Sequence, residues 1–526
     1  TFYQSRIICR IKKLGNEKRC ENRFHSVKAE TLGSFGYYYV RSGFREMLEA
    51  VKDGCHARLF VLKKQICSMK RIFKVLVALL LLLVILLIVC FKPLDITPYE
   101  QTEFYKKELA AIDSVASIRN QQSEIRNFEV GWSRINLLPP FTTPIAIDAN
   151  RGGKHFEGVH DSIYVRAFVF KKGETKVAYI SADLLIIPPS VTKMFDTILQ
   201  KQGFDQHNIF FTATHTHTSI GGWYDSYVGK LFAGKYDARV PQFIASTISK
   251  AVVDAEKNCS PAQIGYGEFP TQQLVFNRLL KQMAHLPEES GEVDSLLRVV
   301  KIEKQTGERA AIITFAAHNT VFHENLMKLS ADWCGRMMRE LNEGGKINFA
   351  SFSAGAVGSM GPHEFSKEQE AEAKYMADGV AKIVLQNFDS IKTEPVANLR
   401  MIHLPLYLRE PNLRVTENVV VRPWLFRKLF GDEKTYVNTL QIGNVFFTGM
   451  PCDFSGELVN EIDSAADKKN LKLIITSFNG GYTGYITDSR RYNLNTYETR
   501  IMGWFGPRNG DYLSEVVMRV MERSAD

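Results

Sequence analysis

Two histidines two positions apart, His215 and His217, form the motif of this sequence that most clearly indicates metal binding or catalysis. They follow the apolar, β-branched run 210–214 and precede the pair Gly221-Gly222. If the run continues as a strand, residues i and i+2 face the same side, so both imidazoles point into one space. Imidazoles arranged in this way bind zinc, or divide the work between metal ligand and proton donor. The alternative is that backbone groups at the strand end satisfy both rings, and one short motif does not decide between the two.

Other polar side chains also follow strand-like runs of the sequence. Because sites in open α/β sheets lie outside the carboxyl ends of the strands, we expect these side chains to converge. Capping or turn chemistry is the alternative for any one of them. The residues concerned are Asp183, His318, Ser359, Asp453, Tyr482 and Tyr485.

Strands and helices alternate from about residue 128 onwards, which predicts an α/β domain with a mixed sheet flanked by helices. Ser330 is a plausible N-cap for one of the helices. The predicted strands are 162–170, 176–181, 209–214, 296–303, 310–316, 349–353, 440–448 and 472–478. The predicted helices are 189–202, 240–258, 333–341, 368–387 and 455–468.

The positive charge of the chain is confined to its N-terminal part. The net charge over 526 residues is +9, but residues 1–74 alone hold 17 Lys and Arg against 6 Asp and Glu. The remainder carries slightly more acidic than basic residues. The main body therefore has no basic footprint for a nucleic acid, and we expect no such partner.

An uncharged run, VLVALLLLLVILLIVCF over residues 75–91, follows the basic residues Lys70, Arg71 and Lys74. Its length approaches the roughly 20 apolar residues that cross a bilayer. The basic flank favours the cytoplasm on the N-terminal side, so the domain that follows is expected outside, as periplasmic or extracellular protein. We interpret residues 69–92 as a single-pass signal anchor; secretion after signal cleavage is the alternative.

This segment divides the chain into four parts. Met69-Lys70-Arg71 resembles a natural start, so residues 1–68 are either upstream sequence joined to that start or a basic cytoplasmic tail. Residues 93–128 are polar and helix-prone and are predicted to form a stalk. Residues 129–526 are predicted to form one catalytic domain.

Several motifs, taken together, resemble those of the neutral/alkaline non-lysosomal ceramidases. The resemblance begins near Gly131 and Arg134 and continues to the C-terminus in order and spacing. It rests on Gly158-Val159-His160, residues 164–168, Thr214-His215-Thr216-His217 with Gly221-Gly222, Asn277-Arg278, Ala316-Ala317-His318, residues 450–454, Tyr482–Thr487, Tyr492, Tyr497-Glu498 and Gly506-Pro507.

The resemblance implies a zinc-dependent amidohydrolase in which activated water cleaves the N-acyl bond of ceramide, a lipid-like substrate. Carried over by motif, the implied Zn²⁺ ligands are His215, His318, Asp453 and Tyr485. His217 would protonate the leaving amine, while Arg278 and Tyr497 would bind the developing oxyanion. Ser359 is the remaining candidate catalytic residue, because it lies in the turn where the family carries a serine.

The sequence departs from the family pattern at three places. Asp453 replaces the glutamate ligand; Gly361 occupies the position of the family serine, with Ser359 at that of an acidic residue. The sequence stops soon after the last motif, Gly506-Pro507, so no C-terminal immunoglobulin-like sandwich is expected. These departures keep two alternatives open: a zinc hydrolase of another N-acyl amine or ester, and a catalytically impaired lipid-binding protein. The oligomeric state is left open by the sequence.

Overall fold

The computed structural model describes residues 36–116, 128–147, 151, 153–271, 273–281, 292–432 and 434–525. Of the predicted N-terminal extension, residues 1–35 lie outside the described residues. The chain divides into two units, one ending at Leu87 and one beginning at Ile88. Each unit is described by itself.

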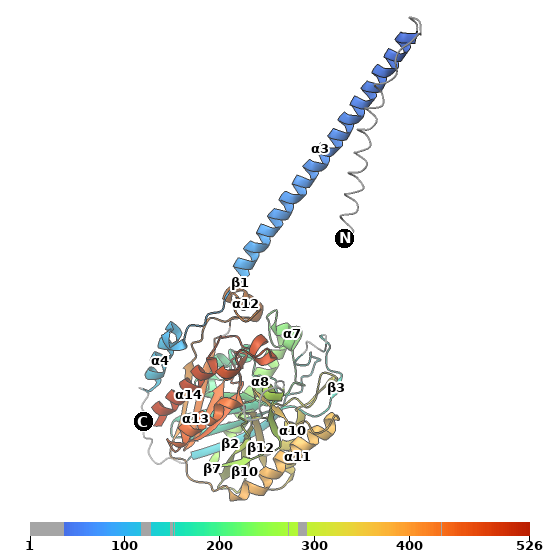
Figure 1. Cartoon of the computed structure of the whole chain (residues 1–526). Helices are drawn as coiled ribbons and strands as arrows, with labels where there is room; N and C mark the ends of the chain where they lie inside the picture. Colours follow the sequence, from blue (N-terminus) through green and yellow to red (C-terminus); the bar gives the residue numbers. More distant parts are fainter. Residues whose placement is uncertain are drawn as a thin grey trace. The chain divides into compact units, whose positions relative to one another are not determined.

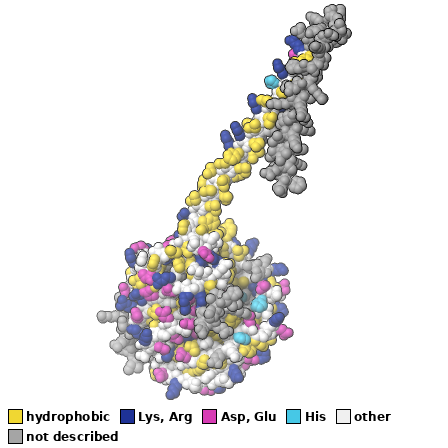
Figure 2. All heavy atoms as spheres, in the orientation of Figure 1, with side chains coloured by type: hydrophobic (Ala, Val, Ile, Leu, Met, Phe, Trp, Pro, Cys, Tyr) yellow, Lys and Arg dark blue, Asp and Glu magenta, His cyan; other side chains and the backbone are white. Residues whose placement is uncertain are grey.

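The first unit contains most of the long helix α3 (Gly36–Cys90). Residues 43–90 of this helix are long and apolar enough to cross a membrane, and the most apolar stretch buries nothing inside the protein. Figure 2 shows this stretch as continuous hydrophobic side chains, with Lys and Arg gathered on the more N-terminal turns. The predicted anchor, residues 69–92, corresponds to the C-terminal part of this helix.

The second unit is built on two sheets whose facing surfaces share one apolar core (Figure 1). Residues such as Tyr179, Phe210 and Val300 of the larger sheet are clustered there with Leu440 and Phe447 of the smaller sheet. The larger, eight-stranded sheet has the order β12-β10-β9-β7-β2-β4-β5-β6 and the smaller the order β14-β16-β17-β19. The prediction of one mixed sheet is therefore correct in class, but the described residues form two main sheets and several two-stranded ones.

Both sheets are mixed. In the larger sheet only β5–β6 and β10–β12 pair in parallel, and in the smaller only β17–β19. The larger sheet comprises β2 (Phe128–Asn136), β4 (Tyr164–Lys172), β5 (Thr175–Ala182), β6 (Ile209–Ala213), β7 (Ser260–Pro270), β9 (Leu296–Lys304), β10 (Arg309–Phe315) and β12 (Phe349–Ala354). The smaller sheet comprises β14 (Leu399–Pro405), β16 (Tyr436–Ile442), β17 (Val445–Met450) and β19 (Lys472–Ser477).

Helices cover the outer faces of both sheets. Those on the larger sheet bury their apolar faces in two further cores, and those on the smaller sheet in a third. On the larger sheet lie α8 (Arg239–Lys257), α10 (Asp332–Glu343) and α11 (Gln369–Asn387). On the smaller sheet lie α4 (Glu103–Ala116), α13 (Val459–Asp467) and α14 (Asn509–Ala525).

Short helices and two-stranded pairs lie outside the two main sheets and their covering helices. The helical pieces are α5 (Pro189–Thr192), α6 (Phe195–Ile198), η3 (Gln200–Gln202), α7 (Gly229–Ala233), α9 (Arg278–Lys281), α12 (Pro423–Phe430), η6 (Gly456–Leu458) and the π-helical turn η8 (Tyr497–Ile501). The short strands are β1 (Phe91–Pro93) with β15 (Val419–Val421), β3 (Gly158–Val159) with β11 (Lys328–Leu329), β8 (Val275–Asn277) with β13 (Met360–Pro362), and β18 (Asp453–Phe454) with β20 (Tyr485–Ile486).

Three predicted elements differ from those observed. The predicted strand 440–448 contains a tight turn at Gly443-Asn444, and β16 and β17 pair antiparallel on either side of it. A two-residue Gly-Asn connection between apolar runs is a hairpin signal. The predicted helix 189–202 is divided into α5, α6 and η3. The N-cap of α10 is Ala331, although the Ser330 hydroxyl accepts a hydrogen bond from the Asp332 N–H.

The described part of the predicted stalk, residues 93–116, packs on the folded unit. Strand β1 pairs antiparallel with β15, and α4 packs on α14 and β14. Tyr99 and Ile112 are buried in the core beneath the smaller sheet. This segment belongs to the domain because its apolar residues complete that core.

Candidate metal centre and substrate pocket

His215 and His217 meet at the end of β6, but the strand alternation used to predict this does not bring them together. Strand β6 ends at Ala213, and His215 adopts a left-handed backbone conformation with φ of 62°. Such a conformation strains a non-glycine residue and is characteristic of functional sites. The Nδ1 atom of His215 lies 2.6 Å from the Leu185 carbonyl oxygen, and its ring stacks on Phe478 at 4.1 Å.

The third imidazole comes from the loop after β10. The Nε2 atom of His318 lies 2.8 Å from Nε2 of His215, and Nε2 of His217 lies 3.3 Å from the same atom. One ligand atom from each ring lies within 4.8 Å of the others, so the three form a group that could hold a metal ion. Nδ1 of His318 is 3.1 Å from the carbonyl oxygen of Val357.

Asp453 adds a carboxylate to this group from the other sheet. It follows β17, and its Oδ1 atom lies 3.4 Å from Nε2 of His215. Its Oδ2 atom accepts a hydrogen bond from the Tyr482 hydroxyl at 2.9 Å, whereas Oδ1 is buried without a hydrogen-bond partner. Gly358 allows this close approach, because a Cβ atom there would lie 2.4 Å from the Asp453 carbonyl oxygen.

Burial sets the charge state of these groups. It lowers the pKa of His215 to about 3 and the pKa values of His217 and His318 well below their usual range. Burial also raises the pKa of Asp453 to about 7, against the opposing effect of Arg278. All three imidazoles are thus neutral, the form in which a ring nitrogen has a lone pair for a metal.

The donor set fits zinc. Zinc binds histidine nitrogen and carboxylate oxygen at about 2.0–2.2 Å in tetrahedral sites, which places neighbouring ligand atoms roughly 3.3 Å apart. The separations of 2.8, 3.3 and 3.4 Å around Nε2 of His215 are close to that value. A buried carboxylate oxygen without a donor is also what a metal ligand would be in the absence of its ion.

Arg278, Tyr485 and Tyr497 line the same cavity as the three histidines. The Arg278 guanidinium donates to the Gly358 carbonyl oxygen at 2.9 Å and lies 3.1 Å from the Glu498 carboxylate. It also lies 5.4 Å from the centre of the Tyr485 ring. The Tyr497 ring packs edge-on against Tyr485 at 5.7 Å and is 41% exposed. Burial raises the pKa of Tyr485 well above its ordinary value, and the nearby Asp453 adds to that effect.

A cavity of about 360 Å³ opens directly onto the histidines. His215, His217, His318, Arg278, Tyr485 and Tyr497 all contribute to its lining. The rest of the lining is largely apolar, and includes Leu185, Ile186, Trp223, Phe232, Phe430 and Trp504. A cavity with a few polar side chains in a largely apolar lining suits a ligand that has a reactive polar group and a hydrocarbon chain.

Ser359 is placed differently from the other predicted site residues. It is fully buried, and its hydroxyl accepts hydrogen bonds from the Ser455 hydroxyl at 2.8 Å and the Gly456 N–H at 3.1 Å. It does not belong to the described residues that line the cavity. Gly361 lies on β13, where a side chain would press on the ring of Phe276.

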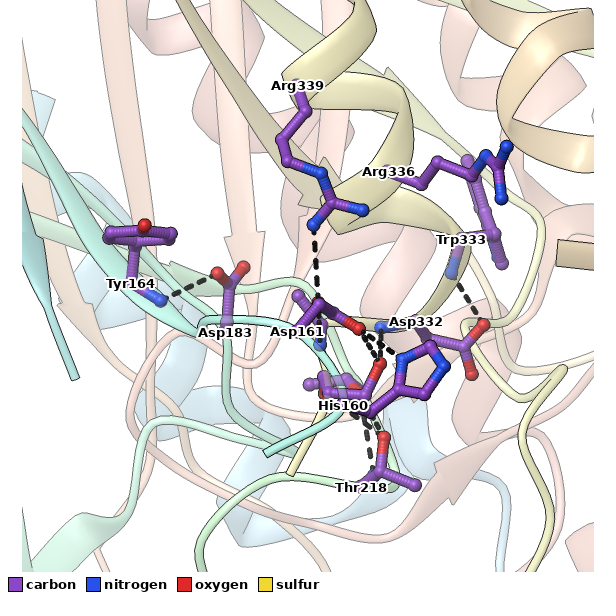
Figure 3. A network of polar contacts seen from close by, with 12 residues as sticks. His160, Asp161, Tyr164, Asp183, Thr218, Asp332, Trp333, Arg336 and Arg339 are labelled. Atoms are coloured by element: carbon purple, nitrogen blue, oxygen red, sulfur yellow. Dashed lines mark hydrogen bonds and ion pairs between the residues drawn. The ribbon is translucent and has the colours of Figure 1, made fainter. Parts of the chain in front are cut away.

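A buried polar network holds the two histidine loops together (Figure 3). The Ser330 carbonyl oxygen accepts hydrogen bonds from the hydroxyls of Thr216 at 2.8 Å and Thr218 at 3.0 Å. The Ser330 hydroxyl in turn donates to Asp161 and accepts from the Asp332 N–H. Asp332, with φ of 58° and a pKa raised to about 7 by burial, accepts from the Phe322 N–H in the loop that carries His318.

The supporting residues were harder to identify from the sequence than the histidines. Tyr482 lies in a predicted strand-end cluster, but its role as the hydrogen-bond partner of Asp453 is visible only in the structure. In the sequence Glu498 has no role beyond its place in a motif, and Phe478, Asp161 and Asp332 have no clear functional signal. Their signal is weak because aromatic and acidic residues beside apolar runs usually serve turns or caps.

Part of the chain matches a known protein family. Residues 150–363 match the family model described as neutral/alkaline non-lysosomal ceramidase, N-terminal. This segment contains His215, His217, Arg278, His318 and Ser359, whereas Asp453, Tyr485 and Tyr497 lie beyond it.

Curated relatives also match part of the chain. The chain is 25% identical to a neutral ceramidase of Pseudomonas aeruginosa over 172 residues, 31% of this chain and 26% of that protein. It is 24% identical to neutral ceramidase A of Dictyostelium discoideum over 221 residues, 40% of this chain and 31% of that protein. The matched region thus spans about a quarter to a third of these relatives.

The fold similarity extends further than the sequence similarity. The crystal structure of neutral ceramidase from Pseudomonas aeruginosa superposes with a TM-score of 0.67 at 16% identity, covering 76% of this chain and 75% of that one. The resemblance predicted from the motifs is therefore confirmed: residues 150–363 match the N-terminal model of the neutral/alkaline non-lysosomal ceramidases, and the fold is similar to that of a neutral ceramidase.

Proposed function

We propose that this protein is a membrane-anchored, zinc-dependent amidohydrolase that cleaves the N-acyl bond of ceramide or a similar lipid. One observation carries the proposal: three neutral imidazoles line a largely apolar cavity, and an unpartnered carboxylate oxygen of Asp453 lies 3.4 Å from Nε2 of His215. The matched relatives are named neutral ceramidases, which supports an amide-bond substrate.

In this proposal His215, His318 and Asp453 hold the ion, with Tyr485 as a weaker fourth ligand. A zinc ion bound there would polarise the amide carbonyl and lower the pKa of a bound water to about 7. The Nδ1 contacts of His215 and His318 with main-chain carbonyl oxygens support the assignment, because metal-binding histidines commonly donate their other ring nitrogen to such groups.

His217 is proposed to carry the proton to the leaving amine. Unlike its two neighbours, its Nδ1 atom has no hydrogen-bond partner among the described residues, so its ring lacks the support typical of a ligand. Its Nε2 atom nevertheless faces the cavity beside the other two rings. A neutral imidazole in that position can take a proton at one step and deliver it at the next.

Arg278 and Tyr497 are proposed to bind the carbonyl oxygen as negative charge develops on it. The contacts of Arg278 with Glu498 and the Gly358 carbonyl hold the guanidinium beside the floor of the cavity. Because that orientation exists before the reaction, little reorganisation accompanies charge development. The exposed face of Tyr497 allows its hydroxyl to contact a substrate at the cavity mouth.

A second candidate function is hydrolysis of another N-acyl amine. It is favoured by Gly361, which stands where the family carries serine, and by the inward-facing Ser359, which is bonded to Ser455 and Gly456. The two candidates share one metal centre and differ only in the group that the apolar walls accept.

The test is an activity screen of the full chain in detergent or vesicles, against ceramides of several acyl lengths and against other N-acyl amines. We expect near-stoichiometric zinc by elemental analysis, loss of hydrolysis on chelation and its return on adding zinc. Preference for a non-sphingoid amide would select the second candidate, and zinc-loaded protein without hydrolysis of any amide would overturn both.

A further inference from the structure

The chain leaves the apolar helix next to the wall of the cavity. Main-chain atoms at the end of that helix are held by α12: Arg422 N–H donates to the Cys90 carbonyl oxygen at 2.8 Å, and Trp424 Nε1 donates to that of Val89 at 3.0 Å. Strand β1, which follows immediately, pairs with β15 immediately before α12. Val89 and Cys90, where the chain leaves the apolar helix (the exit point), are therefore joined directly to α12 within the second unit.

The other end of α12 lines the cavity. Phe430, its last residue, contributes to the cavity wall, and α12 has eight residues. At a rise of 1.5 Å per residue, the exit point and the cavity wall are about 12 Å apart along this helix. Such a short distance places the cavity close to the membrane surface if the apolar helix spans a bilayer.

Exposed apolar side chains gather on the elements that surround this cavity. Helix α7 is tied to α12 by the Val228 N–H, which donates to the Leu429 carbonyl oxygen at 2.9 Å. The turn η8 is joined to the same region through the cluster that contains Phe426, Met502 and Trp504. Beyond the apolar helix, seven of the twelve large hydrophobic side chains exposed among the described residues lie on or beside α7, η8, α12 and β15: Tyr227, Leu231, Tyr497, Ile501, Trp424, Val415 and Val419.

We infer that this rim, formed by α7, α12 and η8, docks on the outer leaflet of the bilayer that holds the apolar helix. The occupant is a lipid surface because the span ends at the rim itself, and because Trp and Tyr beside apolar residues are typical of the membrane–water interface. A membrane lipid could then enter the cavity with its chains remaining among other lipids. This inference rests on the proposed anchor, and only its activity readout rests on the proposed hydrolysis.

Photo-crosslinking of the full chain in phospholipid vesicles tests docking without reference to activity. Leu231, on α7 and 59% exposed, is replaced by p-benzoylphenylalanine, and Ile198, on α6, serves as the control because it is also an exposed aliphatic residue (40%) and lies outside the rim. We expect lipid adducts at position 231 at least about tenfold more abundant than at position 198. Equal labelling at both positions, or none at position 231, would overturn docking.

A second variant separates docking from catalysis. Leu231→Asp removes an apolar contact with the leaflet and adds a charge, yet Leu231 does not line the cavity. Hydrolysis of ceramide in vesicles should fall by about tenfold, while that of a short-chain, water-dispersed N-acyl substrate stays unchanged. An equal loss on both substrates would contradict the docking inference. If wild-type protein hydrolyses neither substrate, the proposed function fails, whereas the crosslinking result still decides docking.

Discussion

The two sheets contribute different halves of the candidate site. The eight-stranded sheet supplies the histidines, whose loops are fixed by main-chain carbonyls and by the network around Ser330, while Phe478, which stacks on His215, follows β19 of the four-stranded sheet. The four-stranded sheet supplies Asp453 and the tyrosines, which adjoin the apolar cluster of the cavity wall. In the proposed function, the first half would hold the metal ion in a fixed position, and the second would combine a ligand with the surface that meets the substrate.

Removing a ligand from the histidine half should give the largest effect. His318→Ala leaves too few donors for the ion, so we expect loss of bound zinc and a fall in amide hydrolysis of roughly 10³-fold or more. Elemental analysis and hydrolysis rates measure the two effects. His207→Ala, at an exposed histidine, is the control. Full zinc retention in both His318→Ala and His215→Ala would remove the metal assignment.

His217 tests whether all three imidazoles share one role. If it carries the proton, His217→Ala should keep zinc and lose about 10²- to 10⁴-fold in kcat. Loss of zinc together with activity would instead show that His217 is a ligand, so that all three histidines hold the ion.

The carboxylate half should respond less strongly. Tyr482→Phe removes the hydrogen bond that fixes Oδ2 of Asp453 without changing the ring. Loss of such an outer partner typically weakens metal binding about 10- to 100-fold. Competition with a chelator measures the change, and unaltered zinc affinity would show that the tyrosine does not orient the carboxylate.

Some features of the site could be predicted from the sequence, and others depend on the folded structure. The run 209–214 and the histidines after it predict a strand end and a site, because apolar periodicity and residue chemistry are local properties. The left-handed backbone of His215 and the pairing of Tyr482 with Asp453 could not be predicted, since both depend on packing between distant segments. The dipeptide Gly443-Asn444 is a local signal for the hairpin, but the apolar residues on both sides of it led to the prediction of one continuous strand.

Glu108 tests the attachment of α4 to the four-stranded half. Its carboxylate is buried and accepts hydrogen bonds from the Tyr407 N–H at 2.7 Å and the Tyr512 hydroxyl at 3.2 Å, and burial raises its pKa from 4.5 to about 7. The folded state therefore holds this proton more tightly than the unfolded state, so stability falls as the pH rises from 4.5 towards about 7.

Glu108→Gln keeps a hydrogen-bond acceptor and cannot ionise. At pH 8 the variant should be more stable than the wild type by up to about 3 kcal/mol, and the difference should vanish near pH 4. Chemical unfolding at the two pH values measures this change. A difference that does not depend on pH would mean that ionisation of Glu108 does not limit the packing of α4.

The smallest effect on activity is expected at Ser359, which lies between the two halves. Its hydroxyl accepts hydrogen bonds from Ser455 and from the Gly456 N–H, so Ser359→Ala leaves buried donors unsatisfied. That loss should lower the free energy of unfolding by about 1–3 kcal/mol. Hydrolysis should nevertheless keep a substantial share of its rate, because this hydroxyl does not line the cavity and the metal centre needs no serine. Ser455→Ala should lower stability in a similar way and is the matched control. An acyl group trapped on Ser359, detected by mass spectrometry of the intact protein during turnover, would reverse this assignment and make the turn a part of the catalytic site.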